Sequence, residues 1–176
     1  MIMENQNNGN GNGQVKPKRR SSPPPIEVRQ SAIHGRGAFA TRKIRKGQRI
    51  IEYVGKRMPW EAASEDPDDP HTFLFGLSDC DLVINAAISG NESRWINHSC
   101  DPNCEAVEEG KRVFIYALRN LQPGEELFYD YGLQIDEPRS AETEKQFQCF
   151  CGAKECRGTL LAPEDEEAAP ETAGKC

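Results

Sequence analysis

The chain has no run of about 18 apolar residues, which is close to the shortest stretch that spans a membrane as a helix. Its N-terminus, MIMENQNNGNGNGQ, lacks the apolar core of a secretory signal. No internal repeat is visible, which argues against a solenoid. Together these absences predict an intracellular protein without a membrane segment, in the cytoplasm or on a chromosome in the nucleus.

A sequence of 176 residues is sufficient for one domain with a single core. Residues 1–25 are rich in Asn and Gly, then basic, then proline-rich, whereas residues 162–176 are acidic. Neither end has enough apolar surface to support folding. We therefore expect a disordered basic arm at 1–25, a disordered acidic tail at 162–176, and a folded part between them.

The net charge of −6 is unevenly distributed. The arm has four basic residues and one acidic residue, and the tail has five acidic residues and one basic residue, which leaves the folded part at −5. An acidic body favours a basic protein or peptide as partner and argues against gripping a nucleic acid backbone. The KPKRR run of the arm could contact nucleic acid weakly, serve as a targeting signal, or simply be a solvated basic tail that keeps the chain soluble. We expect a monomer.

The folded part consists of short apolar or alternating runs separated by glycine and proline. The runs IEVRQ (26–30), QRIIEY (48–53), TFLFGL (72–77) and LVINA (82–86) predict strands. The segment AVEEGKRVFIYAL predicts a hairpin that turns at Glu109-Gly110-Lys111. LQPGEELFYDYG adds a turn and one more strand, and the only good helix candidate is short, around 91–96. The fold class is therefore mostly β.

Seven cysteines in a chain of this kind favour metal ligation or reduced thiols over disulfides. Cys149, Cys151 and Cys156 have the spacing C-x-C-x4-C. Three thiolates within eight residues can bind zinc, which takes four tetrahedral ligands. The spacing leaves the fourth ligand open among Cys80, Cys100, Cys104, Cys176 and a histidine.

Two further motifs are modest signals when taken alone. IHGRGAF (33–39) has a Gly-x-Gly that is not a dinucleotide fingerprint, because the third glycine and the following helix are missing. It does offer backbone amides that a ligand can approach closely. In GEELFYDYG, Tyr129 and Tyr131 fall on one face of an extended segment and could together orient an amine, or they could simply pack against a core.

The stretch RWINHSCDPNC (94–104) has three interpretations. A Cys–His nucleophile is one, but His98 and Cys100 stand only two residues apart, which argues against it. Metal ligation by Cys100 or Cys104 is the second. A compact polar turn, in which Asn97 and Ser99 bond to the local backbone, is the third and is compatible with the second.

The order of these motifs is more specific than any one of them. IHGRGAF, EYVG (52–55), GNESRWINHSCDPNC (90–104), ELFYDYG (126–132) and CFCGAKECRGTLL together resemble the SET-domain family of protein-lysine methyltransferases with a post-SET zinc segment. The resemblance covers about 26–161. It implies a stand-alone SET domain at 26–135 and a zinc segment at 145–161, with a β-clip-like fold of small curved sheets and a pseudoknot. In that knot the chain after NHSC passes under the loop that contains DY.

The resemblance also implies S-adenosylmethionine as the methyl donor and a lysine of a basic protein as the acceptor. The family's cofactor contacts fall on two parts of the sequence and on two aromatic positions, namely His34, Gly35, Arg36, Gly37, Phe73, Asn97, His98 and Phe150. Its zinc ligands fall on Cys100, Cys149, Cys151 and Cys156. Cys104 is left without a role.

Tyr131 matches the catalytic tyrosine of the family, which orients the amine, and Tyr129 stands where the family has Tyr or Phe. A Tyr there narrows the lysine channel, so we expect mainly monomethylation.

One position departs from the family: Phe73 replaces the usual Tyr and removes a hydroxyl contact. His71 could substitute. The competing hypothesis is therefore a zinc-stabilised binding module with weak or no turnover. The insert EAASEDPDDP (61–70) either attracts a basic peptide or is a solvated loop.

Overall fold

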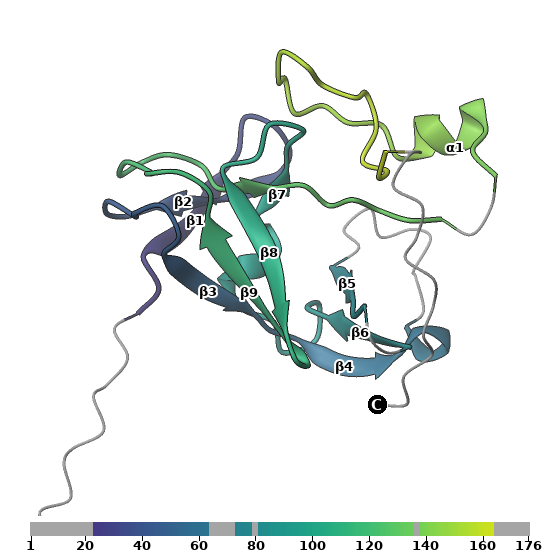
Figure 1. Ribbon diagram of the computed structural model, residues 1–176, viewed down its shortest axis with the longest axis horizontal. Coiled ribbons are helices and arrows are strands. Elements are labelled where there is room, and N and C mark those ends of the chain that lie inside the picture. Colours follow the sequence, from purple (N-terminus) through teal and green to yellow (C-terminus); the bar gives the residue numbers. More distant parts are fainter. Residues whose placement is uncertain (1–22, 64–72, 79–80, 136–137, 164–176) are drawn as a thin grey trace, which may run out of the picture.

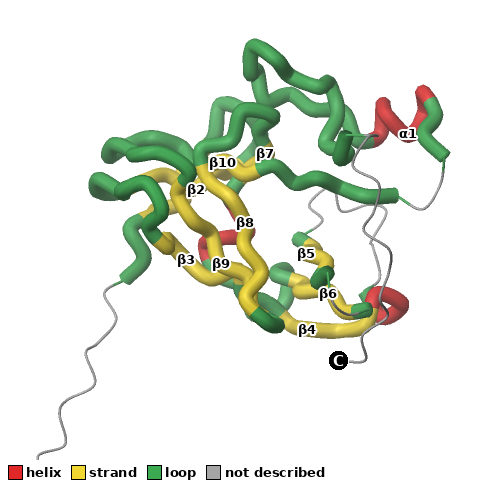
Figure 2. Tube along the Cα trace, viewed as in Figure 1, coloured by secondary structure: helices red, strands yellow, loops and turns green. Residues whose placement is uncertain are grey.

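The computed structural model describes residues 23–63, 73–78, 81–135 and 138–163. The arm up to residue 22, the tail from 164, His71 with most of the insert at 61–70, and Cys80 and Cys176 lie outside these ranges. The described chain is built mainly from short strands and loops, as Figure 2 shows. The expected fold class, mostly β with small sheets, is confirmed.

The largest sheet has the strand order β3-β9-β8 (Figure 1). Strands β8 (Cys104–Glu109) and β9 (Arg112–Ala117) form the expected hairpin, and Gly110 adopts the positive φ of 62° that its tight turn requires. β3 (Arg49–Tyr53) pairs with β9 in antiparallel register. Val113 and Ile115 of β9 are completely buried, which makes this strand the centre of the fold.

Two smaller antiparallel sheets flank this one. β1 (Ile26–Gln30) pairs with β2 (Arg36–Ala40), and the turn between them carries the Gly-x-Gly motif. β6 (Leu82–Asn85) lies between β4 (Lys56–Pro59) and β5 (Leu74–Gly76). A 3-10 turn, η1 (Trp60–Ala62), follows β4. The buried apolar residues form two clusters, one with residues of β1, β2 and β3 and the other with Ile84 of β6, and β9 contributes to both.

A parallel pair of very short strands brings two distant motifs together. β7 (Asn97–His98) pairs with β10 (Phe128–Tyr129), so that Asn97 is opposite Phe128 and His98 is opposite Tyr129. Ser99 N–H donates to the Tyr129 carbonyl at 3.2 Å and extends the pairing. Parallel strands cannot be joined by a tight turn. The NHSC and DY segments therefore become neighbours only because the chain returns past the β8–β9 hairpin.

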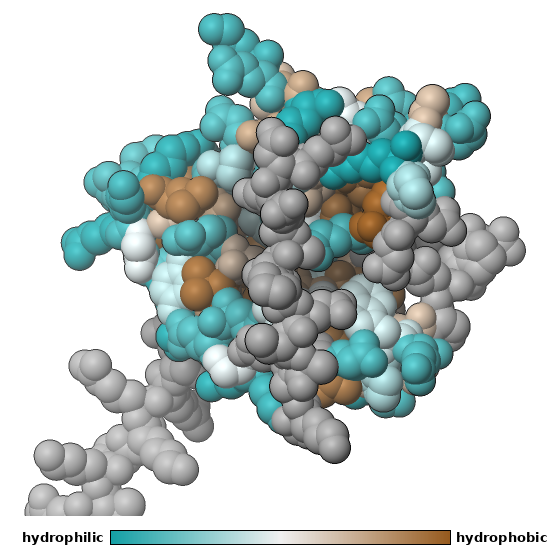
Figure 3. Space-filling view, turned by 45° about the vertical axis from the view of Figure 1, so that its right-hand side comes forward, coloured by the Kyte–Doolittle hydropathy of each residue, from teal (hydrophilic) through white to brown (hydrophobic). Residues whose placement is uncertain are grey.

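Ile44, Ile96, Ile115, Leu121 and Leu127 are at most 1% exposed and form the main core with their neighbours. Only Ile115 lies in a named strand, and the other four lie in the loops and isolated bridges between the strands. On the face drawn in Figure 3 the described surface is largely hydrophilic, with smaller apolar patches. None of the helices within the described ranges is long and apolar enough to cross a membrane.

The helix prediction was incomplete. The segment expected at 91–96 is a 3-10 helix, η2 (Glu92–Trp95), with the Asn91 side chain accepting from Ser93 N–H. A short helix, α1 (Ala141–Gln146), was not predicted; Ser140 caps it and it buries no residue. A helix with no apolar face produces no hydrophobic period in the sequence, so pattern analysis does not detect it. The strands at 48–53, 72–77 and 82–86 are each shorter than expected.

The chain after β10 is mostly loop and returns to the domain through a few backbone pairings. Leu161 forms a parallel bridge with Leu133, and Gln148 forms an antiparallel bridge with Thr159. Leu161 is completely buried. We refer to residues 147–162 as the C-terminal segment, which Figure 1 shows in yellow-green above the sheets.

Candidate active site and metal centre

Asn97 is held by three acceptors at the start of β7. Its Nδ2 lies 3.0 Å from the Arg36 carbonyl, 3.0 Å from Glu126 Oε1 and 3.4 Å from the His34 carbonyl. Carbonyl and carboxylate oxygens only accept, so the group that faces them must be the NH₂ of the amide. The Asn97 Oδ1 is therefore left to accept a hydrogen bond from a ligand.

Glu126 was not identified from the sequence as a site residue. A Cβ on Gly37 would lie 2.0 Å from Glu126 Oε1, so glycine at this position is required for the carboxylate to reach Asn97. Gly35, two residues earlier, adopts a positive φ of 46°. The Gly-x-Gly motif thus serves a turn and the close approach of the Glu126 side chain, and the approach of a ligand to its backbone stays a prediction. In the sequence, the indication that Glu126 could belong to the site is its position three residues before Tyr129.

His98 joins two parts of the site through its two ring nitrogens. Nδ1 lies 3.0 Å from Tyr131 N–H, which can only donate, so Nδ1 accepts and the ring proton is on Nε2. Nε2 lies 3.3 Å from Cys100 Sγ and donates to it. The side chain is 5% exposed, and burial lowers the pKa of His98 despite the neighbouring Asp130 carboxylate. The ring is therefore neutral near pH 7.

His98 and Cys100 stand two residues apart in the sequence, and their side chains are in contact. The ring and the thiol meet because the turn at Ser99–Asp101 folds back on itself, with Asp101 N–H donating to Ser99 Oγ. A nucleophilic pair is disfavoured for another reason. Cys100 belongs to a group of four thiols, whose shared position suits a metal better than a free nucleophile.

Those four thiols meet in space. The Sγ atoms of Cys100, Cys149, Cys151 and Cys156 all lie within 4.8 Å of one another. The separations of Cys100 from Cys149 and Cys156 are 3.8 and 3.9 Å, and that between Cys151 and Cys156 is 3.6 Å. Sulfurs at about 2.3 Å from a tetrahedral zinc ion are about 3.8 Å apart, so the spacing fits zinc.

The backbone around the thiols also favours thiolates. Each sulfur accepts one backbone N–H at 3.4–3.5 Å, from Cys100, Cys151, Arg157 and Gly158. Burial opposes ionisation of Cys151, but the amide donors outweigh it and lower the pKa of this thiol to about 6. Burial raises the pKa of Cys149, the most buried of the four. A bound cation would offset that cost, and zinc is therefore the metal that this donor set would hold.

An ion pair also links the C-terminal segment to the residues next to Tyr131. The Arg157 guanidinium donates to both carboxylate oxygens of Asp130, at 2.6 and 2.8 Å. Burial disfavours the charged carboxylate, but the bidentate guanidinium and the N–H of Gly132 together lower the pKa of Asp130. Arg157 directly follows a metal-site cysteine, so the ion pair and the thiol group act on the same stretch of chain.

Aromatic rings form a continuous row through the site. The centroids of Tyr53 and Phe75 are 5.4 Å apart, those of Phe75 and Tyr129 are 6.5 Å apart, and those of Tyr129 and Tyr131 are 4.9 Å apart. The ring of His98 follows at 5.3 Å from Tyr131. Tyr129 and Tyr131 thus lie against each other, and the row ends at the side chain that contacts the thiol group.

The hydroxyl of Tyr131 donates to the Ile96 carbonyl at 3.0 Å. Burial raises the pKa of Tyr131 well above its usual value, and it does the same for Tyr129 and Tyr53. All three phenols therefore keep their protons at neutral pH. Because the Tyr131 proton is directed at Ile96, the hydroxyl oxygen remains available as an acceptor for a donor that enters the site.

The structure has two separate depressions near these residues. One, of about 480 Å³, is lined mainly by β1 and η2 and includes Arg36, Arg94 and Trp95. The guanidinium groups of Arg36 and Arg94 lie 4.6 and 4.9 Å from the Trp95 ring. The ring of Phe73 packs edge-on against Trp95 at 5.1 Å. Arg94 and Trp95 open the stretch 94–104, but no role was predicted for them from the sequence.

The other depression, of about 350 Å³, is lined by Phe75, Tyr131, Asp130 and Glu105 together with Cys104 and its neighbours. Two carboxylates and aromatic rings make it suited to a cationic, partly apolar chain. Cys104 is 1% exposed, and burial raises the pKa of its thiol to about 12, so it is an unreactive core residue.

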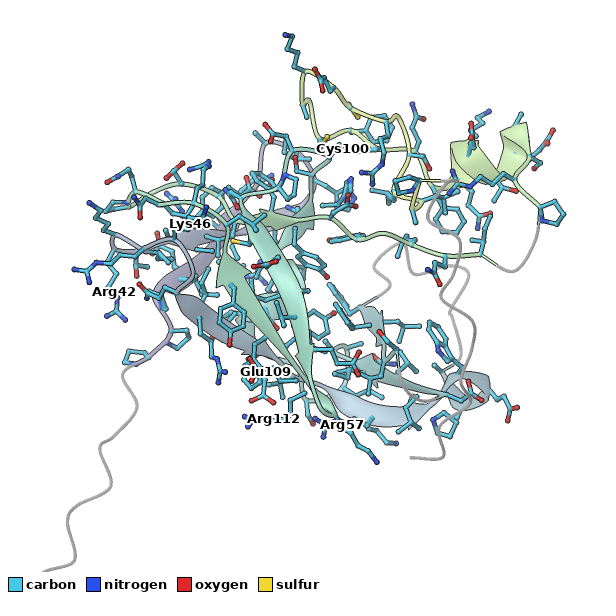
Figure 4. The ribbon with its side chains drawn as sticks, viewed as in Figure 1. Arg42, Lys46, Arg57, Cys100, Glu109 and Arg112 are labelled. Atoms are coloured by element: carbon cyan, nitrogen blue, oxygen red, sulfur yellow. The ribbon has the colours of Figure 1, made fainter. Side chains whose placement is uncertain are left out.

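Most of the remaining sequence-predicted residues are on the surface. His34 and Gly35 in the turn between β1 and β2 are exposed, as is Arg36 at the start of β2, whereas Gly37 is buried. Phe150 lies between two of the cysteines and is 67% exposed. In Figure 4 Cys100 lies where the C-terminal segment meets the sheets. The site is therefore assembled from the β1–β2 turn, β7, β10 and that segment.

Comparison with known proteins gives a family match. The model of the SET domain matches residues 35–132, which is more than half of the chain. Histone-lysine N-methyltransferase 2B of Homo sapiens is 38% identical over 151 residues, covering 81% of this chain and 5% of the relative. The H3 lysine-4 specific histone-lysine N-methyltransferase of Candida albicans is 38% identical over 146 residues, covering 77% and 14%. The chain thus spans only a small part of these relatives.

Two solved structures have a similar fold. KRYPTONITE, in complex with mCHH DNA, an H3(1–15) peptide and SAH, matches with a TM-score of 0.63 and 30% identity, covering 77% of this chain and 29% of the other. Arabidopsis thaliana SUVH6, in complex with SAM, matches with a TM-score of 0.65 and 30% identity, covering 79% and 33%. Both likenesses extend across most of the described residues.

Proposed function

The chain belongs to the SET-domain family, and on this premise we propose that it is a protein-lysine N-methyltransferase that uses S-adenosylmethionine. The relatives with that activity in their names and the neighbours solved with SAM or SAH support the assignment. We also infer that residues 26–135 form the SET domain and 145–161 the zinc segment.

The observation that carries the proposal is the buried Tyr131 hydroxyl, which donates to Ile96 and leaves its oxygen to accept. A neutral lysine amine that donates one N–H to this oxygen keeps its lone pair free to attack. S-adenosylmethionine supplies the methyl group on a sulfonium. The contribution of the protein is the alignment of the amine with that methyl group in a dry aromatic channel, which also lowers the pKa of the lysine.

We infer that the cofactor binds next to Asn97. The free Asn97 Oδ1 and the carbonyls of the β1–β2 turn are acceptors suited to the ammonium group of its methionine part. His34, Gly35, Arg36 and Gly37 would surround that end. We assign Phe73, His98 and Phe150 to the remainder of the cofactor, with the exposed ring of Phe150 able to cover the adenine.

We infer that the substrate is a basic segment of a protein, and a histone is the first to test. The exposed carboxylate of Glu105 at the second depression supports a cationic substrate, whereas the Asp130 carboxylate there is already paired with Arg157. The names of the relatives support a histone and hence an enzyme that works on chromatin. The acid-rich insert at 61–70 lies largely outside the described residues and adds nothing to this choice.

Mainly monomethylation is proposed because Tyr129 packs directly on Tyr131 and is 8% exposed. A second methyl group on the amine requires rotation in the space that the Tyr129 hydroxyl fills. Tyr129→Phe is expected to shift the products from monomethyl-lysine to di- and trimethyl-lysine, as measured by mass spectrometry. Efficient trimethylation by the wild type would contradict the proposal.

The experiment for the activity combines binding and turnover. S-adenosylmethionine is expected to raise the melting temperature, and a mixture of histones is expected to accept labelled methyl groups. Tyr131→Phe should lower the rate by about 10²-fold or more while retaining the thermal shift, since only the positioned hydroxyl is lost. An unchanged rate would refute the role of Tyr131.

The competing hypothesis, a zinc-stabilised binding module, is favoured by Phe73, which lacks a hydroxyl. In the structure the Tyr53 hydroxyl donates to the Phe73 carbonyl at 3.2 Å, so a phenol is present nearby. A thermal shift with S-adenosylmethionine but no methyl transfer to any basic protein would favour the module over the enzyme.

A further inference from the structure

The turn between β2 and β3 is the most basic described stretch of the chain. The sequence TRKIRKGQ (41–48) places four cations within five residues, at Arg42, Lys43, Arg45 and Lys46. All four side chains are exposed. Within the described parts of the chain, none of the four forms an ion pair with a carboxylate. We refer to residues 41–48 as the basic loop.

The basic loop is rigidly attached to the body. Ile44, at its centre, is completely buried and exchanges backbone hydrogen bonds of 3.1 and 2.9 Å with Leu121. Lys46 N–H donates to Asn120 Oδ1 at 3.0 Å, and Gly47 N–H donates to the Ala117 carbonyl at 2.7 Å. The two pairs of cations on either side of Ile44 are therefore presented on a fixed backbone. Binding there costs little ordering of the main chain.

The acidic groups near this edge are already engaged. Glu125 accepts from Arg119 at 2.9 Å and also from the backbone N–H of Gln122. Glu126 accepts from Asn97 at the site described above. Neither of these two carboxylates pairs with the basic loop. This edge of the molecule is therefore basic, although the net charge of the chain is negative. That modifies the expectation, based on net charge, that the body does not contact nucleic acid.

The loop also lies apart from the thiol group and beside the end of the arm. Figure 4 shows Arg42 and Lys46 at one edge of the molecule, away from both Cys100 and Arg57. Thr41 N–H donates to the Pro25 carbonyl at 2.9 Å, so the chain enters the fold beside the loop. The basic KPKRR run (16–20) ends only five residues before Pro25 in the sequence.

We propose that the basic loop binds the phosphate backbone of double-stranded DNA without reading its sequence. Exposed Arg and Lys side chains are the groups that neutralise phosphates, and they carry no base recognition by themselves. Single-stranded binding uses aromatic platforms for stacked bases, and the exposed large apolar residues of the described chain, Trp60, Ile88 and Phe150, lie outside the loop. A duplex is therefore favoured over a single strand. The proposal is independent of the catalytic assignment.

The test measures binding of the full chain to a fluorescein-labelled 30-base-pair duplex by anisotropy between 50 and 200 mM NaCl. The loop variant is R42Q/K43Q/R45Q/K46Q. The matched control, K56Q/R57Q/K145Q/K154Q, removes four exposed cations elsewhere and changes the net charge equally. An arm variant, K16Q/K18Q/R19Q/R20Q, isolates the contribution of the arm. Circular dichroism and melting temperature establish that each variant is folded.

Each phosphate contact contributes about 0.9 to the slope of log K against log salt. The loop variant is therefore expected to lower that slope by about 2–4 and to weaken binding at 50 mM salt by about tenfold or more. The control is expected to weaken binding by less than about threefold. Equal losses in the loop variant and the control would overturn the proposal, because net charge alone would then account for binding.

Two further outcomes test whether the basic loop is the DNA-binding surface. Complete loss of binding in the arm variant, with none in the loop variant, would overturn the proposal in favour of the arm. Polyglutamate, added at the same concentration of negative charge as unlabelled duplex, is expected to compete poorly. Equal competition would also overturn the proposal, since the loop would then bind acidic chains in general. Methyl transfer to free histones is unaffected in the loop variant if the proposal is correct.

Discussion

The body around β3, β9 and β8 and the C-terminal segment are held by different kinds of interaction. The body buries aliphatic side chains from its three antiparallel sheets, and Ile44, Ile96 and Ile115 are at most 1% exposed. The C-terminal segment buries Leu161 and Ala162 and is also held by backbone bridges, by four thiols and by the Asp130–Arg157 ion pair. Burial of apolar surface stabilises the body without a metal and with little dependence on charge, whereas the segment depends more on a metal and on charge.

This contrast assigns different roles to the two regions. The Tyr131 segment is attached to the body through β10 and to the C-terminal segment through Asp130 and His98. Loss of the segment would therefore disturb the proposed active site without removing the core. The predictions below test that separation, from the largest expected effect to the smallest.

Removal of the metal is expected to have the largest effect. A chelator, or Cys151→Ser, should abolish amide protection in 147–162 while β8 and β9 remain protected, because a structural zinc site can contribute on the order of 10 kcal/mol to the chain that it organises. Hydrogen exchange with mass spectrometry, together with metal analysis, measures both. Cys104→Ser serves as the control that retains the metal. Unfolding of the whole domain on chelation, or an active wild type without metal, would contradict this account.

Truncation in the core is expected to act on the body. Ile115→Ala should lower the free energy of unfolding by about 2–5 kcal/mol, since the removed side chain is completely buried at the centre of the sheet. Denaturant unfolding measures this loss, and the metal content of the folded protein should stay at one zinc. Ile88→Ala, at a 42% exposed site, is the matched control and should cost far less. A loss of metal in the folded Ile115 variant would break the separation.

Asp130→Asn is expected to weaken the attachment of the C-terminal segment by about 1 kcal/mol, a value reduced from that of a buried pair because both side chains are partly exposed. The pKa of Asp130 is lowered in the folded state, so its contribution is present above the ordinary value of about 4 and is lost as the pH falls through the folded value. The difference in protection between wild type and variant should therefore persist down to about pH 4 and disappear only once the pH has fallen below the folded pKa of Asp130. A difference that persists there would contradict the ion-pair explanation.

The smallest effect is expected for the surface pair of Arg112 and Glu52, which meet at 2.5 Å across β9 and β3. Arg112→Gln should shift the melting temperature less than Asp130→Asn does, and added salt should remove the shift, because exposed ion pairs are screened. Differential scanning fluorimetry at low and high salt measures this. A shift as large as that of Ile115→Ala would show that the surface of the sheet stabilises the body.

Much of the fold could be predicted from local patterns. The β8–β9 hairpin follows from the turn at Gly110 between two apolar runs, and the short strands follow from alternation. The α1 helix could not be predicted, because it has no apolar face and is defined by the Ser140 cap alone. The site was predictable where a motif carries it, as at Asn97 and Tyr131. The site was not predictable at Glu126 and Arg94, because Glu and Arg are common surface residue types.

The sequence by itself determined the types of group available: thiols at zinc spacing near the C-terminus, two tyrosines on one face, and a chain of short strands. These features depend on covalent spacing, which the sequence contains. Only the tertiary structure decided which groups meet. It grouped Cys100 with thiols about 50 residues away and left Cys104 in the core, it directed Glu126 to Asn97, and it buried Ile44 so that the four cations around it face outward. Contacts between distant residues depend on how the sheets pack, and spacing along the chain does not specify that.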